Sequence, residues 1–398
     1  MDPIKASELS RPSFKANPYP FFARLRAEAP VCPFSVPFYG RGWLVARYDD
    51  VVTFLKDDRF SKDLSAKTPW LPPFARPLTQ QMASRDPPDH TRLRTLVSKA
   101  FTPRRIEQLR GRVQDVCDEL LAAVPSGGPF DIVHSYALPL PLTVFAELLG
   151  IAEADRRRFH ILTRGTLPLG APSGVLDFPL AMPYLWLLMR YFRKLFAERR
   201  ARPKDDLLTA LVQAEEAGDR LSEDELLGMA VILLLAGYET TVHLIGNGAL
   251  ALLQHPEQRE RFEQEPALAE SAIEELLRYT SPVEFTPPRL TREEVSLAGV
   301  TIPGGELVAG IVGSANHDEA QFAEPERLDL AREPNRHVSF GQGAHFCLGA
   351  ALARLEGQIA LTTLFRRLPG LRLARPGEAL RWRRLLAMRG LEELPVAF

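Results

Sequence analysis

One long apolar helix constrains this sequence more than any other feature. Ser222 and Glu225 have the spacing of a capping box, and Pro256 follows the expected end, so we predict a helix over 222–254. A helix of about 32 residues is ~48 Å long, which is enough to cross a whole domain. Between 226 and 235 its apolar residues lie on every face, which indicates a buried helix. The rest of the fold must therefore surround this helix.

Polar side chains interrupt this apolar helix near its middle, in the sequence AGYETT at 236–241. Burying a carboxylate and two hydroxyls is costly unless they have a use, so we expect a functional site here. We predict that Gly237 lets the helix open locally. The Thr240 hydroxyl is expected to bond to the Ala236 carbonyl, four residues earlier.

The remaining sequence predicts a mainly α fold with minor β structure. Periodic apolar positions predict further helices over 17–29, 90–124, 136–149, 184–202, 257–279 and 349–368. Strands are predicted at 42–48 and within 295–312, where Gly304-Gly305 marks a hairpin turn, with a weaker pair near the C-terminus. The segments 69–88 and 167–183 combine prolines with apolar residues, which indicates apolar loops that cover something. Residues 1–398 contain no internal repeat or flexible linker, and length alone leaves the number of domains open.

Composition narrows the classes of partner and location. The 49 Lys and Arg residues balance 50 Asp and Glu residues, which argues against nucleic acid as a general partner. No secretory signal is evident, and the most apolar segment, 229–237, is too short to span a membrane. We therefore expect a cytoplasmic protein without a membrane anchor. Cys32, Cys117 and Cys347 are too few for a disulfide framework, so a conspicuous cysteine must be a core residue or a ligand.

The most specific motif is FGQGAHFCLG at 340–349, which places Cys347 on a glycine-rich turn. A helix is expected to begin near Gly349, and its first N–H groups would favour a thiolate at the sulfur. This segment resembles the haem-binding loop of the cytochrome P450 family. The resemblance implies that Cys347 ligates iron and that Phe340, Gly341 and Gly349 contact the haem.

Further motifs support this resemblance along the chain. Glu275 and Arg278 resemble the family's Glu-x-x-Arg pair behind the haem, and Arg327 matches the arginine that completes its ion network. Glu239 and Thr240 resemble the acid–alcohol pair of the central helix, which delivers protons to dioxygen. Further haem contacts are implied for His90, Arg94, Arg289, His345 and Ala236. The implied fold is a triangular, mostly helical single domain with a long central helix over one haem b.

The resemblance implies a bacterial-type monooxygenase. It would hydroxylate or epoxidise an apolar small molecule with O2 and electrons from a ferredoxin and its reductase. A polyketide or macrolide, a terpenoid, a steroid and a fatty acid all remain open as substrates. The pocket implied by analogy contains Trp70, Phe74, Leu167, Phe178, Leu233, Val283, Phe285 and Met388.

Two other functions are compatible with the same fold. One is a peroxygenase driven by peroxide, and the other is a non-enzymatic haem sensor or carrier. Peroxide already brings its protons and a sensor needs no proton relay, so the Glu239-Thr240 pair argues against both. A basic window over 85–112, with eight basic and three acidic residues, is the predicted docking face for an acidic ferredoxin. Arg104 and Arg105 lie within it.

Overall fold

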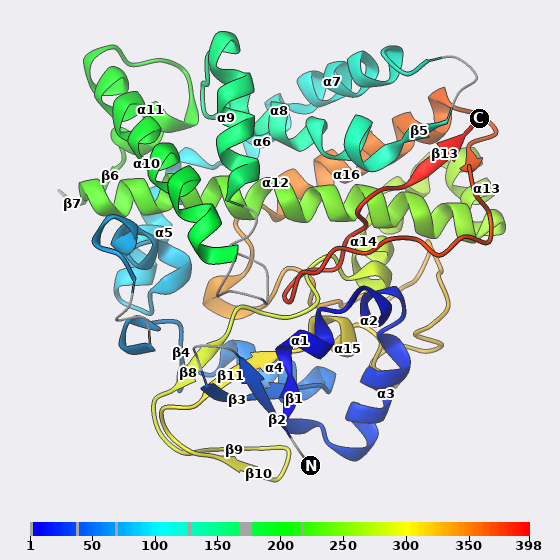
Figure 1. Ribbon diagram of the computed structural model, residues 1–398, viewed down its shortest axis with the longest axis horizontal. Helices are drawn as coiled ribbons and strands as arrows, with labels where there is room; N and C mark the ends of the chain where they lie inside the picture. Colours follow the sequence, from blue (N-terminus) through cyan, green and yellow to red (C-terminus); the bar gives the residue numbers. More distant parts are fainter. Residues whose placement is uncertain (1–2, 37–39, 68–70, 126–128, 167–176, 217–218) are drawn as a thin grey trace.

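The computed structural model describes residues 3–36, 40–67, 71–125, 129–166, 177–216 and 219–398. Its central element is helix α12 (Glu223–Gln254), which runs across the middle of the molecule in Figure 1. The capping box is present, since the Ser222 side chain accepts from the Glu225 N–H and the Glu225 carboxylate accepts from the Ser222 N–H. The predicted helix over 222–254 is therefore confirmed.

Shorter helices surround α12. In Figure 1, α7, α8 and α9 lie on one side of α12, the largest sheet lies on the other, and α10 crosses α12. The helices other than α12 in the described residues are α1 (Ala6–Leu9), α2 (Pro12–Ala16), α3 (Tyr19–Glu28), α4 (Tyr48–Lys56), α5 (Asp89–Ala100), α6 (Pro103–Gln108), α7 (Arg110–Ala122), α8 (Pro139–Leu148), α9 (Glu153–Gly165), α10 (Asp177–Ala201), α11 (Leu207–Val212), α13 (Pro256–Gln264), α14 (Ala269–Thr280), α15 (Val312–Ala315) and α16 (Ala350–Arg367).

Prolines divide two of the predicted helices. The prediction of one helix over 90–124 was wrong, because Pro103 starts α6, with the Thr102 side chain as its cap. The prediction over 257–279 was also wrong, because Pro266 begins a short 3₁₀ turn between α13 and α14. Helix α10, by contrast, begins before the predicted position and continues through Pro183.

The main sheet has six strands in the order β1-β2-β3-β11-β8-β4. The described strands are β1 (Ile4–Lys5), β2 (Val31–Val36), β3 (Gly40–Val45), β4 (Phe60–Ser61), β5 (Phe130–Asp131), β6 (Glu215–Glu216), β7 (Asp219–Arg220), β8 (Arg289–Thr291), β9 (Val295–Leu297), β10 (Val300–Ile302), β11 (Leu307–Gly310), β12 (Arg372–Leu373) and β13 (Pro395–Ala397). The pair β12–β13 confirms the weak C-terminal strand signal.

The hairpin turn between β9 and β10 lies at a different place from the predicted one. Ala298 and Gly299 form it, and both have positive φ angles (49° and 77°), as a tight two-residue hairpin requires. Gly305, also at positive φ (80°), belongs to the next connection, from β10 to β11. The double glycine therefore marks a turn outside the hairpin.

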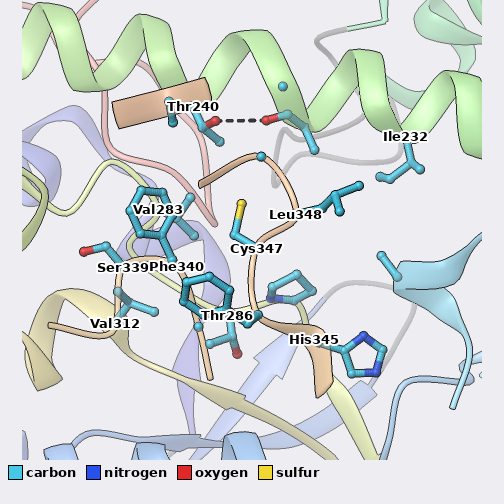
Figure 2. A pocket seen from close by; sticks show the side chains of 18 of the residues that line it. Ile232, Thr240, Val283, Thr286, Val312, Ser339, Phe340, His345, Cys347 and Leu348 are labelled. Atoms are coloured by element: carbon cyan, nitrogen blue, oxygen red, sulfur yellow. Dashed lines mark hydrogen bonds between the residues drawn. The ribbon is translucent and has the colours of Figure 1, made fainter. Parts of the chain in front are cut away.

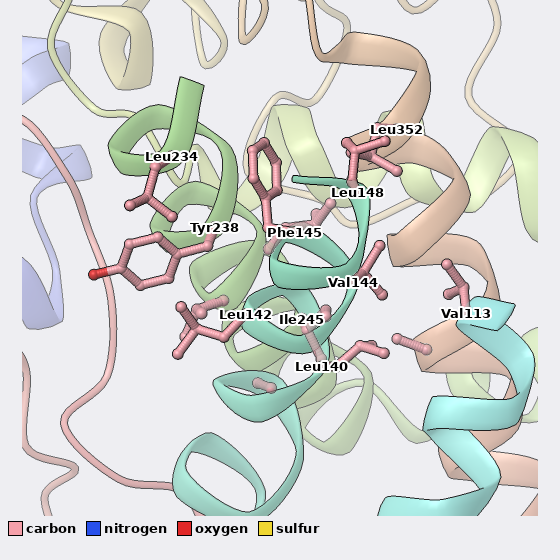
Figure 3. Packing of buried hydrophobic residues seen from close by; sticks show 14 of the residues in the cluster. Val113, Leu140, Leu142, Val144, Phe145, Leu148, Leu234, Tyr238, Ile245 and Leu352 are labelled. Atoms are coloured by element: carbon pink, nitrogen blue, oxygen red, sulfur yellow. The ribbon is translucent and has the colours of Figure 1, made fainter. Parts of the chain in front are cut away.

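The largest core cluster forms where α8 packs against α12. Figure 3 shows Leu142 and Phe145 from α8 facing Tyr238 and Ile245 from α12. Gly237 allows this contact, since a Cβ atom there would lie 2.2 Å from the Phe145 ring. The helix stays continuous at Gly237, so the prediction that this glycine lets the helix open was wrong. The glycine instead allows close packing.

Helix α12 is long and apolar enough to cross a membrane by length and composition. Within the fold, however, 72% of its most apolar stretch is buried. Its apolar side chains are therefore covered by the surrounding helices, as its sequence predicts.

Candidate active site

A cavity of about 330 Å³ separates α12 from the loop that carries Cys347. Figure 2 shows the Cys347 sulfur pointing toward α12, where Thr240 lies. Most of the lining is apolar, and it includes Leu233 and Ala236 from α12 together with Val283. The cavity thus combines a sulfur on one wall, a hydroxyl on the opposite wall and apolar surface between them.

Glycines shape the cysteine loop. Gly341 and Gly343 both have φ angles near 70° (68° and 72°), which side chains other than glycine rarely adopt. The Cys347 N–H donates to the Phe340 carbonyl at 2.9 Å, and α16 begins three residues after the cysteine. Phe340, Gly341 and Gly349 all line the cavity, as the motif implies.

The electrostatics of Cys347 differ from the sequence expectation. Burial raises the pKa of Cys347 above its ordinary value, although the Gly349 N–H, Arg94 and Arg354 act in the opposite direction. The Gly349 N–H at the start of α16 favours the thiolate, while burial opposes it. The Cys347 side chain is exposed where it lines the cavity. A metal ion deprotonates a thiol that coordinates it, so a sulfur in this position fits an iron ligand.

Five basic side chains line one side of the cavity: Lys62, His90, Arg94, Arg289 and His345. The Nε and Nη2 atoms of Arg289 and the Nδ1 atom of His90 are buried without a hydrogen-bond partner in the protein. The His90 and His345 rings pack 4.0 Å apart between centroids. Burial and neighbouring cations lower the pKa of Lys62 to about 7 and that of His345 to about 3. The unpartnered atoms of Arg289 and His90 fit a ligand bearing carboxylates, such as the haem propionates.

Arg94 reaches the basic side of the cavity from α5, and its Nη1 also donates to the Phe346 carbonyl at 2.6 Å. Lys62 was missed from the sequence, because one lysine after a two-residue strand carries no motif. Its buried position comes from the pairing of β4 with β8, which brings it beside Arg289.

Thr240 and Glu239 point in different directions. The Thr240 hydroxyl donates to the Ala236 carbonyl at 2.9 Å, as predicted, and lines the cavity. Glu239 is not among the described residues that line it. Its carboxylate instead faces Arg383, whose Nη1 lies 3.3 Å from Oε1. Burial raises the pKa of Glu239 to about 7, although Arg383 lowers it.

The ion network behind the cysteine loop uses a different arginine from the predicted one. Glu275 and Arg278 form a fully buried bidentate pair, with both contacts at 2.8 Å. The Arg332 Nε donates to both Glu275 oxygens, at 3.1 and 3.2 Å. The prediction of Arg327 was therefore wrong: its side chain is 63% exposed and pairs with Glu324, while its backbone carbonyl accepts from Arg278. Arg327 lies only three residues after Glu324, so its side chain pairs with this neighbour in solvent and does not reach Glu275.

The implied substrate residues divide into several groups. Leu233 and Val283 line the cavity, whereas Met388 does not line it and pairs with Val283 in an isolated antiparallel β-bridge. Phe285 is buried in a separate core cluster, beside the N-terminal helices, and does not line the cavity. Phe74 lies in a 3₁₀ segment (Pro73–Thr79) and packs against the main core.

Three implied pocket residues receive no side-chain description. Trp70 and Leu167 lie outside the described residues, and Phe178 is placed only as part of α10. Lining residues that were not predicted include Ile232, Met82, Ala83, Thr286 and Pro287. Met82 and Ala83 come from the proline-rich segment 69–88, so that segment does cover the cavity.

Comparison with known proteins agrees with this geometry. The family model described as "Cytochrome P450" matches residues 187–369. The polyketide biosynthesis cytochrome P450 PksS of Bacillus subtilis is 42% identical, with 96% of each chain covered. Its solved structure, that of the bacillaene polyketide synthase cytochrome P450, matches with a TM-score of 0.92 over 98% of each chain.

Two further relatives are similar over nearly their whole length. The vitamin D(3) 25-hydroxylase of Pseudonocardia autotrophica is 44% identical, covering 96% of this chain and 94% of the relative. The 6-deoxyerythronolide B hydroxylase of Saccharopolyspora erythraea is 41% identical, covering 98% of each. With this identity over almost the full length, and with the cysteine loop facing the central helix, the chain belongs to the cytochrome P450 family, as a monooxygenase that uses haem.

Proposed function

We propose that this monooxygenase hydroxylates or epoxidises an apolar small molecule of the polyketide class. The observation that supports it is the apolar cavity between the Cys347 sulfur and the Thr240 hydroxyl. Residues 1–398 would act as one cytoplasmic catalytic domain. The cofactor would be haem b, the co-substrate O2 and the electron donor a ferredoxin served by its reductase.

Haem b, when bound, would supply the activation of dioxygen. The protein's residues would hold the haem, shield the substrate from water and provide protons. Cys347 would ligate the iron as a thiolate, which favours O–O cleavage. Arg289 and His90 would hold the propionates with the donors that now lack partners. Apolar residues such as Leu233 and Val283 would keep bulk water from the substrate.

Protons would come from the α12 side. The Thr240 hydroxyl lines the cavity and is held by its bond to the Ala236 carbonyl. Glu239, whose pKa burial raises to about 7, would hold a proton over part of the neutral range and pass it on through Thr240. Such a supply suits a reaction that consumes protons with dioxygen.

The substrate class follows from similarity to enzymes named for a polyketide pathway and for 6-deoxyerythronolide B. The similarity to a vitamin D(3) 25-hydroxylase makes a steroid-like substrate the second candidate. A binding screen by absorption spectroscopy tests this choice with macrolactones, vitamin D(3), terpenoids and fatty acids. We expect macrolactones or linear polyketides to shift the haem spectrum at the lowest concentration, and tighter binding of vitamin D(3) would overturn the choice.

The reaction type is tested by changing the oxidant. A monooxygenase should form product with NADH, a surrogate ferredoxin and its reductase, and only slowly with peroxide. Fast turnover with peroxide alone would indicate the peroxygenase. No turnover in either assay, despite a spectral response to the ligand, would indicate a sensor or carrier.

A further inference from the structure

A row of polar side chains runs along one buried face of α12. Glu239, His243 and Asn247 are spaced by four residues, so they lie on the same side of the helix. We call these three residues the polar stripe. All three are buried. A buried helix face made of a carboxylate, an imidazole and an amide is costly unless each group has a role.

The C-terminal segment, residues 382–391, covers the polar stripe. The Asn247 amide donates to the Arg389 carbonyl at 2.8 Å, and the Arg383 Nη1 lies 3.3 Å from the Glu239 Oε1. Gly390 fits directly over His243, because a Cβ atom there would lie 1.9 Å from the imidazole Nδ1. The segment is therefore held against α12 at three successive points.

Exposure changes along this contact. The Arg383 side chain is 30% exposed, whereas that of Glu239 is 9% exposed and that of His243 is 1% exposed. Arg383 thus reaches from solvent to the buried carboxylate. Deeper in the stripe, the His243 Nε2 and Asn247 Oδ1 atoms have no hydrogen-bond partner in the protein. Buried polar atoms of this kind are the usual sites of internal water.

We propose that Arg383 is a positioning residue, which keeps Glu239 in contact with solvent and sets the pH at which this carboxyl exchanges its proton. The inference deepens the proposed function and rests on the proton-donor role of Glu239. When the carboxyl passes its proton toward Thr240 it becomes a carboxylate, and a hydronium ion from bulk water restores the proton beside Arg383. Arg383 keeps its own proton throughout, because a guanidinium does not deprotonate in proteins.

The charges around the stripe support this assignment. From α12 itself, Tyr238 and His243 flank Glu239, and neither carries a charge at neutral pH, because burial raises the pKa of Tyr238 and lowers that of His243 to about 3. Lys15 from α2 acts on His243, and Arg164 from α9 acts on Tyr238. Arg383 is the charged group that acts on Glu239 itself among the described residues, and it opposes the effect of burial.

The test measures the protonation of Glu239 directly in the ferric, substrate-free holoenzyme. A pH titration by infrared difference spectroscopy follows the carboxyl C=O band that Glu239→Gln removes. Arg383→Gln should raise the midpoint of this band by about one pH unit, since a cation at this distance stabilises the carboxylate. Arg383→Lys should restore the parent midpoint. Arg381→Gln is the matched control, because Arg381 is an exposed neighbour that pairs with Glu393 and should leave the midpoint unchanged.

Folding is controlled in the same variants. The Arg383 N–H donates to the Gly390 carbonyl without using the side chain, so Arg383→Gln should keep the segment in place. A melting temperature equal to that of Arg381→Gln would verify this. A midpoint that does not move in a folded Arg383→Gln variant would overturn the proposal, and so would a parent protein without a titrating Glu239 band.

A second readout separates this inference from the proposed function. Product formed per NADH should fall at high pH, as Glu239 loses its proton, and Arg383→Gln should move that fall upward by the same shift as the infrared midpoint. If Glu239→Gln leaves product per NADH unchanged, the donor role of Glu239 fails. If Glu239→Gln is impaired but Arg383→Gln keeps the parent pH profile, only the role of Arg383 fails.

Discussion

At the scale of single residues, Cys347 carries the most specific expectation. Its sulfur faces the cavity from a loop shaped by Gly341 and Gly343. Cys347→Ser should abolish the red-shifted carbon monoxide band of a ferrous haem bound to a thiolate, because serine supplies no thiolate. Cys117→Ser, at a buried cysteine of the main core, is the control and should retain the band. A Cys347→Ser protein that keeps the band would remove Cys347 as the ligand.

Thr240 allows a prediction about coupling. Thr240→Ala removes the hydroxyl that lines the cavity, while the helix backbone around Ala236 stays unchanged. We expect normal haem content but more peroxide and less product for each NADH consumed, since the proton supply is lost. Thr163→Ala is the control, because the Thr163 hydroxyl on α9 also donates to a carbonyl four residues earlier, that of Phe159, and does not line the cavity. Equal coupling in Thr240→Ala and the parent would make this threonine purely structural.

Glu356 provides a prediction about pH and stability. It is fully buried on α16, and neither carboxylate oxygen has a hydrogen-bond partner within normal distance. The nearby Thr241 side chain lowers its pKa, against the larger effect of burial. Burial raises its pKa from an ordinary 4.5 to about 8. Below pH 4.5 the carboxyl is protonated in both states. As pH rises toward about 8, the unfolded state loses this proton more easily, so the stability present at low pH is lost.

The neutral isostere should remove that dependence. Glu356→Gln should match the parent's melting temperature near pH 5 and exceed it increasingly toward pH 8. Glu270→Gln, on the first turn of α14, controls for the general effect of removing a carboxylate. A gap between Glu356→Gln and the parent that stays constant across pH would show that Glu356 does not titrate there.

At the scale of elements, the ion network fixes α14 to the loop before the cysteine. Glu275 on α14 is fully buried and accepts from Arg278 and Arg332, while Arg327 lies in solvent. Arg332→Gln should destabilise the protein by about 3 kcal/mol, because it leaves a buried carboxylate with less compensation. Arg327→Gln should change stability by less than about 0.5 kcal/mol. Urea unfolding of both variants makes the comparison, and the reverse order would restore Arg327 to the network.

At the scale of the whole molecule, local patterns predicted elements better than contacts between them. The capping box and apolar faces of α12, and the glycine-rich turn of Cys347, are local in sequence and were read correctly. The partner of Glu239 could not be found this way, since Arg383 lies 144 residues away. Lys62 and Arg332 are likewise placed by distant strand and loop packing. Charged side chains are too abundant for sequence alone to select the one that becomes buried.

Long-range pairing also changes the predicted docking face. Within 85–112 most basic residues form ion pairs. Arg110 pairs with Glu107 inside the window, and four others pair with acidic residues outside it: Arg85 with Asp63, Arg92 with Glu225, Arg105 with Asp205 and Arg112 with Glu147. Arg104 is exposed and forms no ion pair with a described residue. It lies on α6, which packs on α16, the helix after Cys347.

A charge reversal at Arg104 tests electron delivery. Reduction by an acidic ferredoxin should slow as ionic strength rises, because surface charges are screened over ~8 Å at physiological salt. Arg104→Glu should raise the apparent KM for ferredoxin severalfold without changing the spectral response to substrate. Arg157→Glu, on α9, is the control for net charge. Equal KM values for both variants would place the docking site elsewhere.

The separation in sequence between α12 and the segment that covers it has a consequence for synthesis. Residues 239 and 383 are 144 positions apart, so at about 5–20 residues per second a ribosome needs roughly 7–30 s to make the covering segment after the polar stripe. During this interval the nascent helix carries a polar face that its final partner has not yet covered. The last step in building the proton supply is therefore the docking of residues 382–391. Slow docking would leave a protein whose cysteine loop is complete but whose Glu239 is exposed to solvent and has no contact with Arg383.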